Sequence, residues 1–78
     1  KIDGAFVRKI AADQGDYAVV KSINEIGHFL GKQTIAEFVC DARILQLVAE
    51  IGVDYAQGFA IAQPCLMDEL LPNLAVAN

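Results

Sequence analysis

The sequence has little of what would place it in several common classes of protein. Its 78 residues include two cysteines, two prolines, one histidine and no tryptophan. Two cysteines are too few for a disulfide-stabilised scaffold, and they form no C-x-x-C pair, so a reduced compartment such as the cytoplasm is expected. No apolar run reaches the roughly 18 residues that a membrane-spanning helix requires.

Positive charge is also scarce. Six lysines and arginines stand against ten acidic residues, for a net charge of −4, and the basic residues are scattered along the chain. A surface that binds duplex DNA needs a basic stripe, so DNA is not an expected partner. A small ligand that carries phosphate remains compatible with this balance, because a metal ion can supply the positive charge.

Hydrophobic residues, in contrast, are abundant and make up 55% of the chain. A domain of this size buries only about 60% of the surface that its unfolded chain exposes. The excess of apolar residues therefore predicts that some segments are normally covered by structure outside these 78 residues.

Short apolar segments with β-branched residues alternate with segments of helical periodicity. The expected elements are the end of a strand at 1–3, a helical turn within 5–11, a helix at 16–30, a strand at 33–39, a helix at 42–51, a strand at 53–58 and a short helix at 67–71. Asp16 and Asp41 are the expected N-caps of the two longer helices, and Gly31 and Gly52 follow their last residues.

This order, (β)-α-β-α-β-α, is typical of crossover units and predicts an α/β fold with parallel strands. Parallel sheets are covered on both faces, which agrees with strands that do not alternate polar and apolar residues. Phe6, Phe29 and Tyr55 are expected to be packing residues.

Polar side chains end three of the expected strands. Lys1 (with Asp3), Glu37 and Gln57 occupy these positions, and reactive groups in parallel α/β folds gather at such strand ends. Glu37 stands in an apolar strand, where an unpaired carboxylate is costly. Alternatively, Lys1 is a solvated chain end and Gln57 an exposed turn residue.

Two other reactive residue types lie outside this set. His28 is the only histidine, stands late in a helix and is expected to be structural or solvent-facing. Cys40 follows a strand, and it is expected to be an inert small residue rather than a reactive thiol.

Three motifs occur in order along the chain: K-I-D-G at 1–4, T-I-A-E-F-V at 34–39, and D-Y-A-Q-G-F at 54–59 followed by Pro64. They resemble the ends of the sixth, seventh and eighth strands of EAL-type cyclic-di-GMP phosphodiesterases. The resemblance extends to about residue 70, roughly the whole chain. It implies that residues 1–78 are the C-terminal portion of a single EAL domain, a TIM-like (β/α)8 barrel.

The resemblance also implies an activity and the residues that carry it. EAL domains hydrolyse cyclic di-GMP to linear pGpG with Mg²⁺ or Mn²⁺. Lys1 would be the active-site lysine at the attacking water or the phosphate, Glu37 a carboxylate at the second metal, and Gln57 a residue of the substrate pocket. The family's other metal ligands lie upstream of these motifs, so the isolated 78-residue chain is expected to be inactive.

Two positions around the end of the second motif depart from the family pattern. Phe38 stands where the family has glycine, and Cys40 stands where it has glutamate. These changes leave open a second reading, in which the domain is a degenerate EAL receptor that binds cyclic di-GMP or a protein without turnover. A third reading is an unrelated small α/β protein. The upstream E-x-L motif and aspartate pair would separate the first two.

Partners follow from the same resemblance. The expected partners are cyclic di-GMP and the remainder of the EAL barrel. Family members often dimerise and often sit behind sensory or diguanylate-cyclase (GGDEF) modules. A homodimer and such a module are therefore expected of the complete protein.

Overall fold

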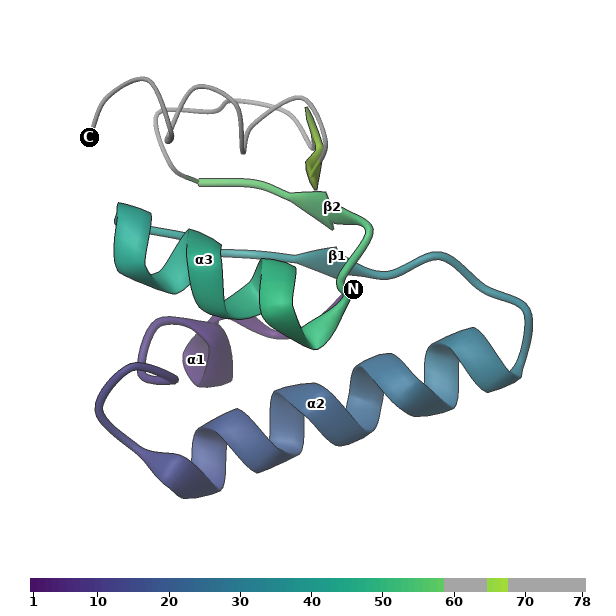
Figure 1. The fold of residues 1–78 in the computed structure, drawn as a ribbon, viewed down its shortest axis with the longest axis horizontal. Helices are drawn as coiled ribbons and strands as arrows, with labels where there is room; N and C mark the ends of the chain where they lie inside the picture. The colour runs from purple at the N-terminus through teal and green to yellow at the C-terminus, as the bar shows by residue number, and fades with distance from the viewer. Residues whose placement is uncertain (59–64, 68–78) are drawn as a thin grey trace.

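A computed structural model describes residues 1–58 and 65–67, which form helices packed beside a small sheet (Figure 1). The elements are α1 (Gly4–Val7), α2 (Gln14–Phe29), β1 (Ile35–Ala36), α3 (Ala42–Ile51), β2 (Tyr55–Ala56) and β3 (Cys65–Leu66). In the view of Figure 1, α3 runs alongside β1 and β2, and α2 lies along the opposite border of the molecule.

The predicted parallel pairing is confirmed for three segments. Ile2 forms a parallel bridge with Ala36, and β1 pairs in parallel with β2 so that Ala36 lies opposite Ala56. The chain that connects each of these segments to the next contains at least one helix, as is usual for crossover connections between parallel strands. The strands are much shorter than predicted, because their lengths are set by pairing with neighbours rather than by local composition.

The prediction of an all-parallel sheet is wrong at one edge. The sheet has the order β1-β2-β3, and β3 pairs antiparallel with β2, which makes the sheet mixed. No strand was predicted at 65–66, so this antiparallel pair was not foreseen. The short helix predicted at 67–71 lies, beyond Met67, outside the described residues.

Local capping explains where the helices begin and end. The Asp41 carboxylate accepts a hydrogen bond from the Ile44 backbone N–H at 2.8 Å, and α3 ends at Gly52, whose φ is +98°. The prediction that Asp16 caps α2 is wrong. Asp13 caps this helix instead by accepting from the Gly15 and Asp16 N–H groups, so α2 begins two residues earlier than expected.

A single hydrophobic core joins the helices to the sheet. Its smallest members, Ala36 and Ala56, lie opposite each other on β1 and β2 and are fully buried. The other buried apolar residues of the described ranges are Ile2, Val7, Ile10, Val20, Val39, Ile44, Leu45, Leu47, Val48, Val53 and Met67. Burying one such aliphatic side chain contributes about 1.5–3 kcal/mol, so this cluster fixes the strand ends relative to α3.

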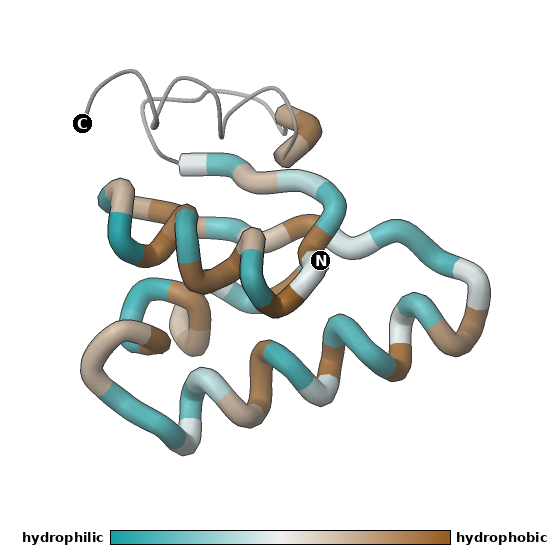
Figure 2. The backbone as a smooth tube through the Cα atoms, in the orientation of Figure 1, coloured by the Kyte–Doolittle hydropathy of each residue, from teal (hydrophilic) through white to brown (hydrophobic). Residues whose placement is uncertain are grey.

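The apolar stripe of α2 is less covered than the sequence suggested. Phe29, expected to pack, is 90% exposed, and Phe6 is also exposed. Figure 2 shows hydrophobic segments recurring along α2 to its far end, which extends past the other helices. α2 meets the other described elements at Val20 and Asn24, which are buried, at Tyr17, which packs against the core, and at His28, which contacts Asp54.

Candidate functional site

The three predicted site residues lie together near the carboxyl ends of the parallel segments. The Glu37 backbone N–H donates to the Ile2 carbonyl at 3.3 Å, and the Gln57 N–H donates to the Ala36 carbonyl at 3.0 Å. This ladder fixes the level at which each strand ends. Because side chains alternate along a strand, Glu37 and Gln57 project away from the face that buries Ala36.

Lys1 and Glu37 form an ion pair across this edge. The Lys1 Nζ lies 3.4 Å from the Glu37 Oε2, with side chains 60% and 33% exposed. An exposed pair of this kind contributes about 1 kcal/mol at most to stability. The alternative reading of Lys1 as a solvated chain end is therefore incomplete, since its amine is directed at the predicted carboxylate.

Glu37 and Gln57 also line one pocket. It has a volume of about 240 Å³, and its described lining residues are Glu37, Phe38, Gln57 and Gly58. A carboxylate and a carboxamide thus line the same pocket. The Lys1 amine lies next to this pocket, because it contacts the Glu37 carboxylate. The arrangement offers an anionic acceptor, a cationic donor and a neutral group that both donates and accepts.

Phe38 and Gly58 are pocket residues that reasoning from strand ends missed. Phe38 has a φ of +58°, and Gly58 has a φ of +114°. A Cβ on Gly58 would lie 2.9 Å from the Val39 backbone nitrogen, so glycine is required for this close approach. The replacement of the family's glycine by Phe38 was the one sequence signal for the left-handed backbone there.

Glu37 has the chemistry of one ligand for a hard divalent cation. Mg²⁺ and Mn²⁺ are bound chiefly through oxygen, and the partly exposed Glu37 carboxylate offers two such atoms. Among the residues that the structure describes, no three His, Cys, Asp or Glu side chains gather closely enough to hold a metal ion. Glu37 therefore fits as a single ligand, and a complete site needs oxygens from elsewhere.

A separate polar network occupies the opposite edge of the sheet, where β1 and β2 begin. The Asp54 Oδ2 accepts from the Thr34 N–H at 2.8 Å and lies 2.7 Å from the His28 Nε2. The Thr34 hydroxyl donates to the Asn24 Oδ1 at 2.5 Å, and the Asn24 amide donates to the Ile51 carbonyl at 3.1 Å. These contacts join α2, α3 and both parallel strands.

The network favours the charged form of Asp54. Burial by itself raises the pKa of Asp54, but the hydrogen bond from the Thr34 backbone and the hydrogen bond and charge of His28 outweigh burial. The pKa is consequently below its ordinary value of 3.8. His28 thus makes a structural contact, which is one of the two roles expected for it, although its partner Asp54 was not foreseen. Residues at this end of parallel strands are typical of stability rather than catalysis.

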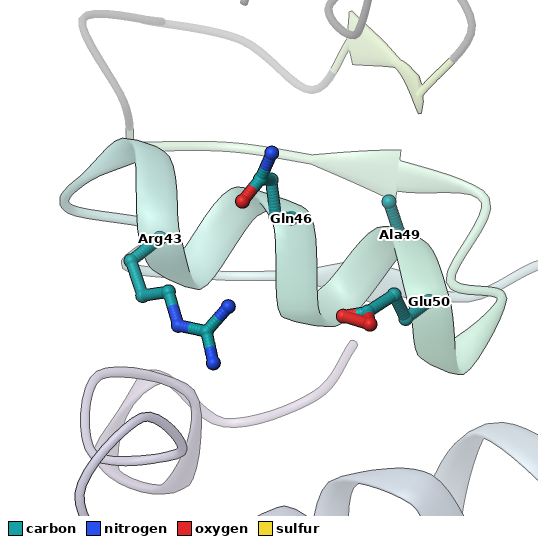
Figure 3. Close-up of a pocket in the computed structure, with 4 residues that line it drawn as sticks. All are labelled: Arg43, Gln46, Ala49 and Glu50. Atoms are coloured by element: carbon teal, nitrogen blue, oxygen red, sulfur yellow. The ribbon is translucent and has the colours of Figure 1, made fainter.

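A larger hollow of about 460 Å³ lies beside α3 (Figure 3). Its described lining residues are Arg43, Gln46, Ala49 and Glu50, which all belong to that one helix. Polar residues along the outer side of a helix are ordinary solvated surface. The smaller pocket at the strand ends is the better candidate, because it joins residues from separate segments of the chain.

Comparisons with known proteins match one family model and several relatives over most of the chain. The family model described as "EAL domain" matches residues 1–64. The chain is 47% identical over 64 residues to the cyclic di-GMP phosphodiesterase PdeB of Shewanella oneidensis, covering 82% of this chain and 8% of PdeB. It is 39% identical over 64 residues to the cyclic di-GMP phosphodiesterase PdeA of Borreliella burgdorferi, covering 82% of this chain and 10% of PdeA.

The fold agrees with the sequence match. The chain superimposes on the EAL enzyme Bd1971, solved in a form with cAMP and cyclic di-GMP bound, with a TM-score of 0.74 and 29% identity. The match covers 94% of this chain and 19% of that structure, so the chain is similar to one part of a larger molecule. In the described ranges, no helix has the length and apolar character needed to cross a membrane.

Proposed function

This chain belongs to the EAL domain family, and from that premise we propose that it is part of a phosphodiesterase that hydrolyses cyclic di-GMP to linear pGpG. In this proposal residues 1–78 are the C-terminal portion of a single EAL domain. They contribute to a TIM-like (β/α)8 barrel whose remaining strands lie on other residues. The names of the curated relatives support this substrate class.

The observation that carries the proposal is the meeting of Lys1, Glu37 and Gln57 at one strand edge. These residues come from three separate segments of the chain. They lie together through the 3.4 Å ion pair and the shared pocket. Hydrolysis of a phosphodiester needs groups that hold the anionic phosphate and the attacking water, and this set provides both kinds.

Each residue has a distinct task in the proposed reaction. Glu37 would hold one of the Mg²⁺ or Mn²⁺ ions, which when bound would activate water and neutralise charge on the phosphodiester. Lys1, held beside Glu37, donates a hydrogen bond to a phosphate oxygen or accepts the proton of the attacking water. Gln57 lines the pocket and orients the nucleotide through its carboxamide. The product pGpG forms when water adds across one of the two phosphodiester linkages.

Several expectations about the complete protein stay predictions. They are the homodimer, the sensory or diguanylate-cyclase module, and the cytoplasmic location. They rest on the family resemblance and on composition.

The test is hydrolysis by the complete domain that contains this chain, with cyclic di-GMP and Mg²⁺ or Mn²⁺, and with pGpG measured by liquid chromatography. Glu37→Gln and Lys1→Met each remove one proposed group and should lower kcat by about a hundred-fold or more. Glu50→Gln and Lys21→Met, at exposed positions on α3 and α2, are the matched controls and should retain activity.

Three results would count against the proposal. Full activity in Glu37→Gln would remove the carboxylate from the mechanism. Tight binding of cyclic di-GMP by the unaltered domain without pGpG formation would instead identify a receptor. Hydrolysis by the isolated 78-residue chain would contradict the need for ligands from the remainder of the barrel.

A further inference from the structure

The unusual feature of the pocket is Phe38, which fold stability does not explain. Its side chain is 64% exposed, so the ring gains only part of the benefit of burial. Its backbone is in the left-handed region, where a residue with a Cβ is disfavoured relative to glycine. Backbone strain of this kind clusters at ligand-binding sites, where the surrounding structure maintains it.

Resting on the proposed function, we propose that Phe38 is a binding residue whose ring stacks on a guanine base of cyclic di-GMP. Phe38 lines the same pocket as Glu37 and Gln57, the two predicted site residues that follow the adjacent strands β1 and β2. A purine presents a flat π face, and aromatic side chains bind bases by stacking against that face. The established family pattern has glycine here, so this contact would be an addition of this chain.

The structure restricts Phe38 both at its ring and at its backbone. The ring lies so close to Gly4 that no Cβ could be accommodated on that residue. The backbone on either side of Phe38 is also fixed, because the Glu37 N–H donates to Ile2 and the Val39 N–H donates to the Gln57 carbonyl at 2.9 Å. A ring positioned before the ligand arrives loses little freedom on binding, which favours affinity.

The pocket around the ring suits one base rather than the whole dinucleotide. Its volume of about 240 Å³ is smaller than the roughly 300–1,000 Å³ typical of sites for drug-sized ligands. Gly58 adds no side chain to the lining and leaves the ring accessible. Gln57 lies in the same space, and its carboxamide has the donor and acceptor groups that the edge of a guanine requires.

The test compares Phe38→Leu, Phe38→Gly and Phe38→Trp in the complete domain. KM and kcat are measured separately for cyclic di-GMP, because a stack on the base should affect KM and leave kcat unchanged. Loss of the stack in Phe38→Leu and Phe38→Gly should raise KM for cyclic di-GMP by about ten-fold. The same variants should leave kcat for cyclic di-GMP within about two-fold of the unaltered domain, because the stack holds the base and not the reacting phosphate. Phe38→Trp should restore the low KM.

Phe29→Leu is the matched control, since Phe29 is an exposed phenylalanine on α2 outside the pocket. An unchanged KM in Phe38→Leu would overturn the inference while leaving the phosphodiesterase intact. A lower KM in Phe38→Gly would also overturn it and would identify the ring as an obstruction. If the unaltered domain does not hydrolyse cyclic di-GMP, equilibrium dialysis with the same variants gives the answer. Equal or absent binding in all of them then overturns the inference.

Discussion

Removing the Asp54 carboxylate should lower the free energy of unfolding, because Asp54 joins the segments that lead into both parallel strands. In Asp54→Ala, the backbone N–H of buried Thr34 loses its acceptor, which costs about 1–3 kcal/mol for an unsatisfied buried group. The contact with His28 contributes less, because the His28 and Asp54 side chains are 39% and 30% exposed, and solvent reduces such a pair to about 0.5–1 kcal/mol. The expected loss in the free energy of unfolding is therefore about 2 kcal/mol.

Asp54→Asn separates the two contributions. Its amide oxygen can still accept from the Thr34 N–H, whereas the charge opposite His28 is gone. The expected cost falls to about 1 kcal/mol. Urea titrations followed by circular dichroism give both values. A double-mutant cycle with His28→Ala should return a coupling of about 0.5–1 kcal/mol. Glu50→Gln, an acidic residue outside the network, is the control and should stay within about 0.5 kcal/mol of the unaltered protein.

The pH dependence of the same variants has a defined sign. The pKa of Asp54 is lower in the folded protein than its ordinary value of 3.8. Its contribution is therefore fully present above the unfolded pKa and is lost as the pH falls through the folded pKa. The stability gap between the unaltered protein and Asp54→Ala should narrow below about pH 3.8. A gap that stays constant at lower pH, or no gap at pH 7, would refute this account.

Two further predictions concern backbone fit and packing. Gly58→Ala should destabilise the protein more than Gly31→Ala, because both positions have positive φ but only at Gly58 would the new Cβ collide with the Val39 backbone. Thermal denaturation should show at least about 1 kcal/mol between the two variants, and equal losses would remove the steric argument. Ala36→Val should cost about 1–3 kcal/mol by overpacking a fully buried position, whereas Ala12→Val, at an exposed turn, should cost little. Comparable losses at both alanines in urea titrations would contradict the tight packing of β1.

Local chemistry made parts of this fold predictable. The bounds of α3 followed from the Asp41 cap and from Gly52, which act within a few residues of the helix ends. The parallel pairing of β1 and β2 followed from the helix between them. The extent of each strand did not, because a strand ends where its partner's backbone ends, and that is a property of the assembled sheet.

The same division applies to the candidate site. Glu37 was identifiable because an acidic residue in an apolar strand is unusual, and the structure places it beside Lys1 and Gln57. The backbone of Phe38 was not predictable from propensity, since a phenylalanine rarely adopts positive φ. The Asp54–Thr34 contact joins residues 20 apart in the chain, so no local pattern revealed it.

The antiparallel strand β3 has a consequence for assembly with the remainder of a barrel. In a closed parallel barrel, every strand has parallel neighbours on both sides. Here β1 pairs with one side of β2 and β3 occupies the other side, where Tyr55 and Ala56 pair with Leu66 and Cys65. A further parallel strand could reach β2 only by displacing β3, so closure there would be an exchange of strands rather than an addition. Until that exchange, β3 shields the outer backbone of β2 from edge-to-edge association with other chains.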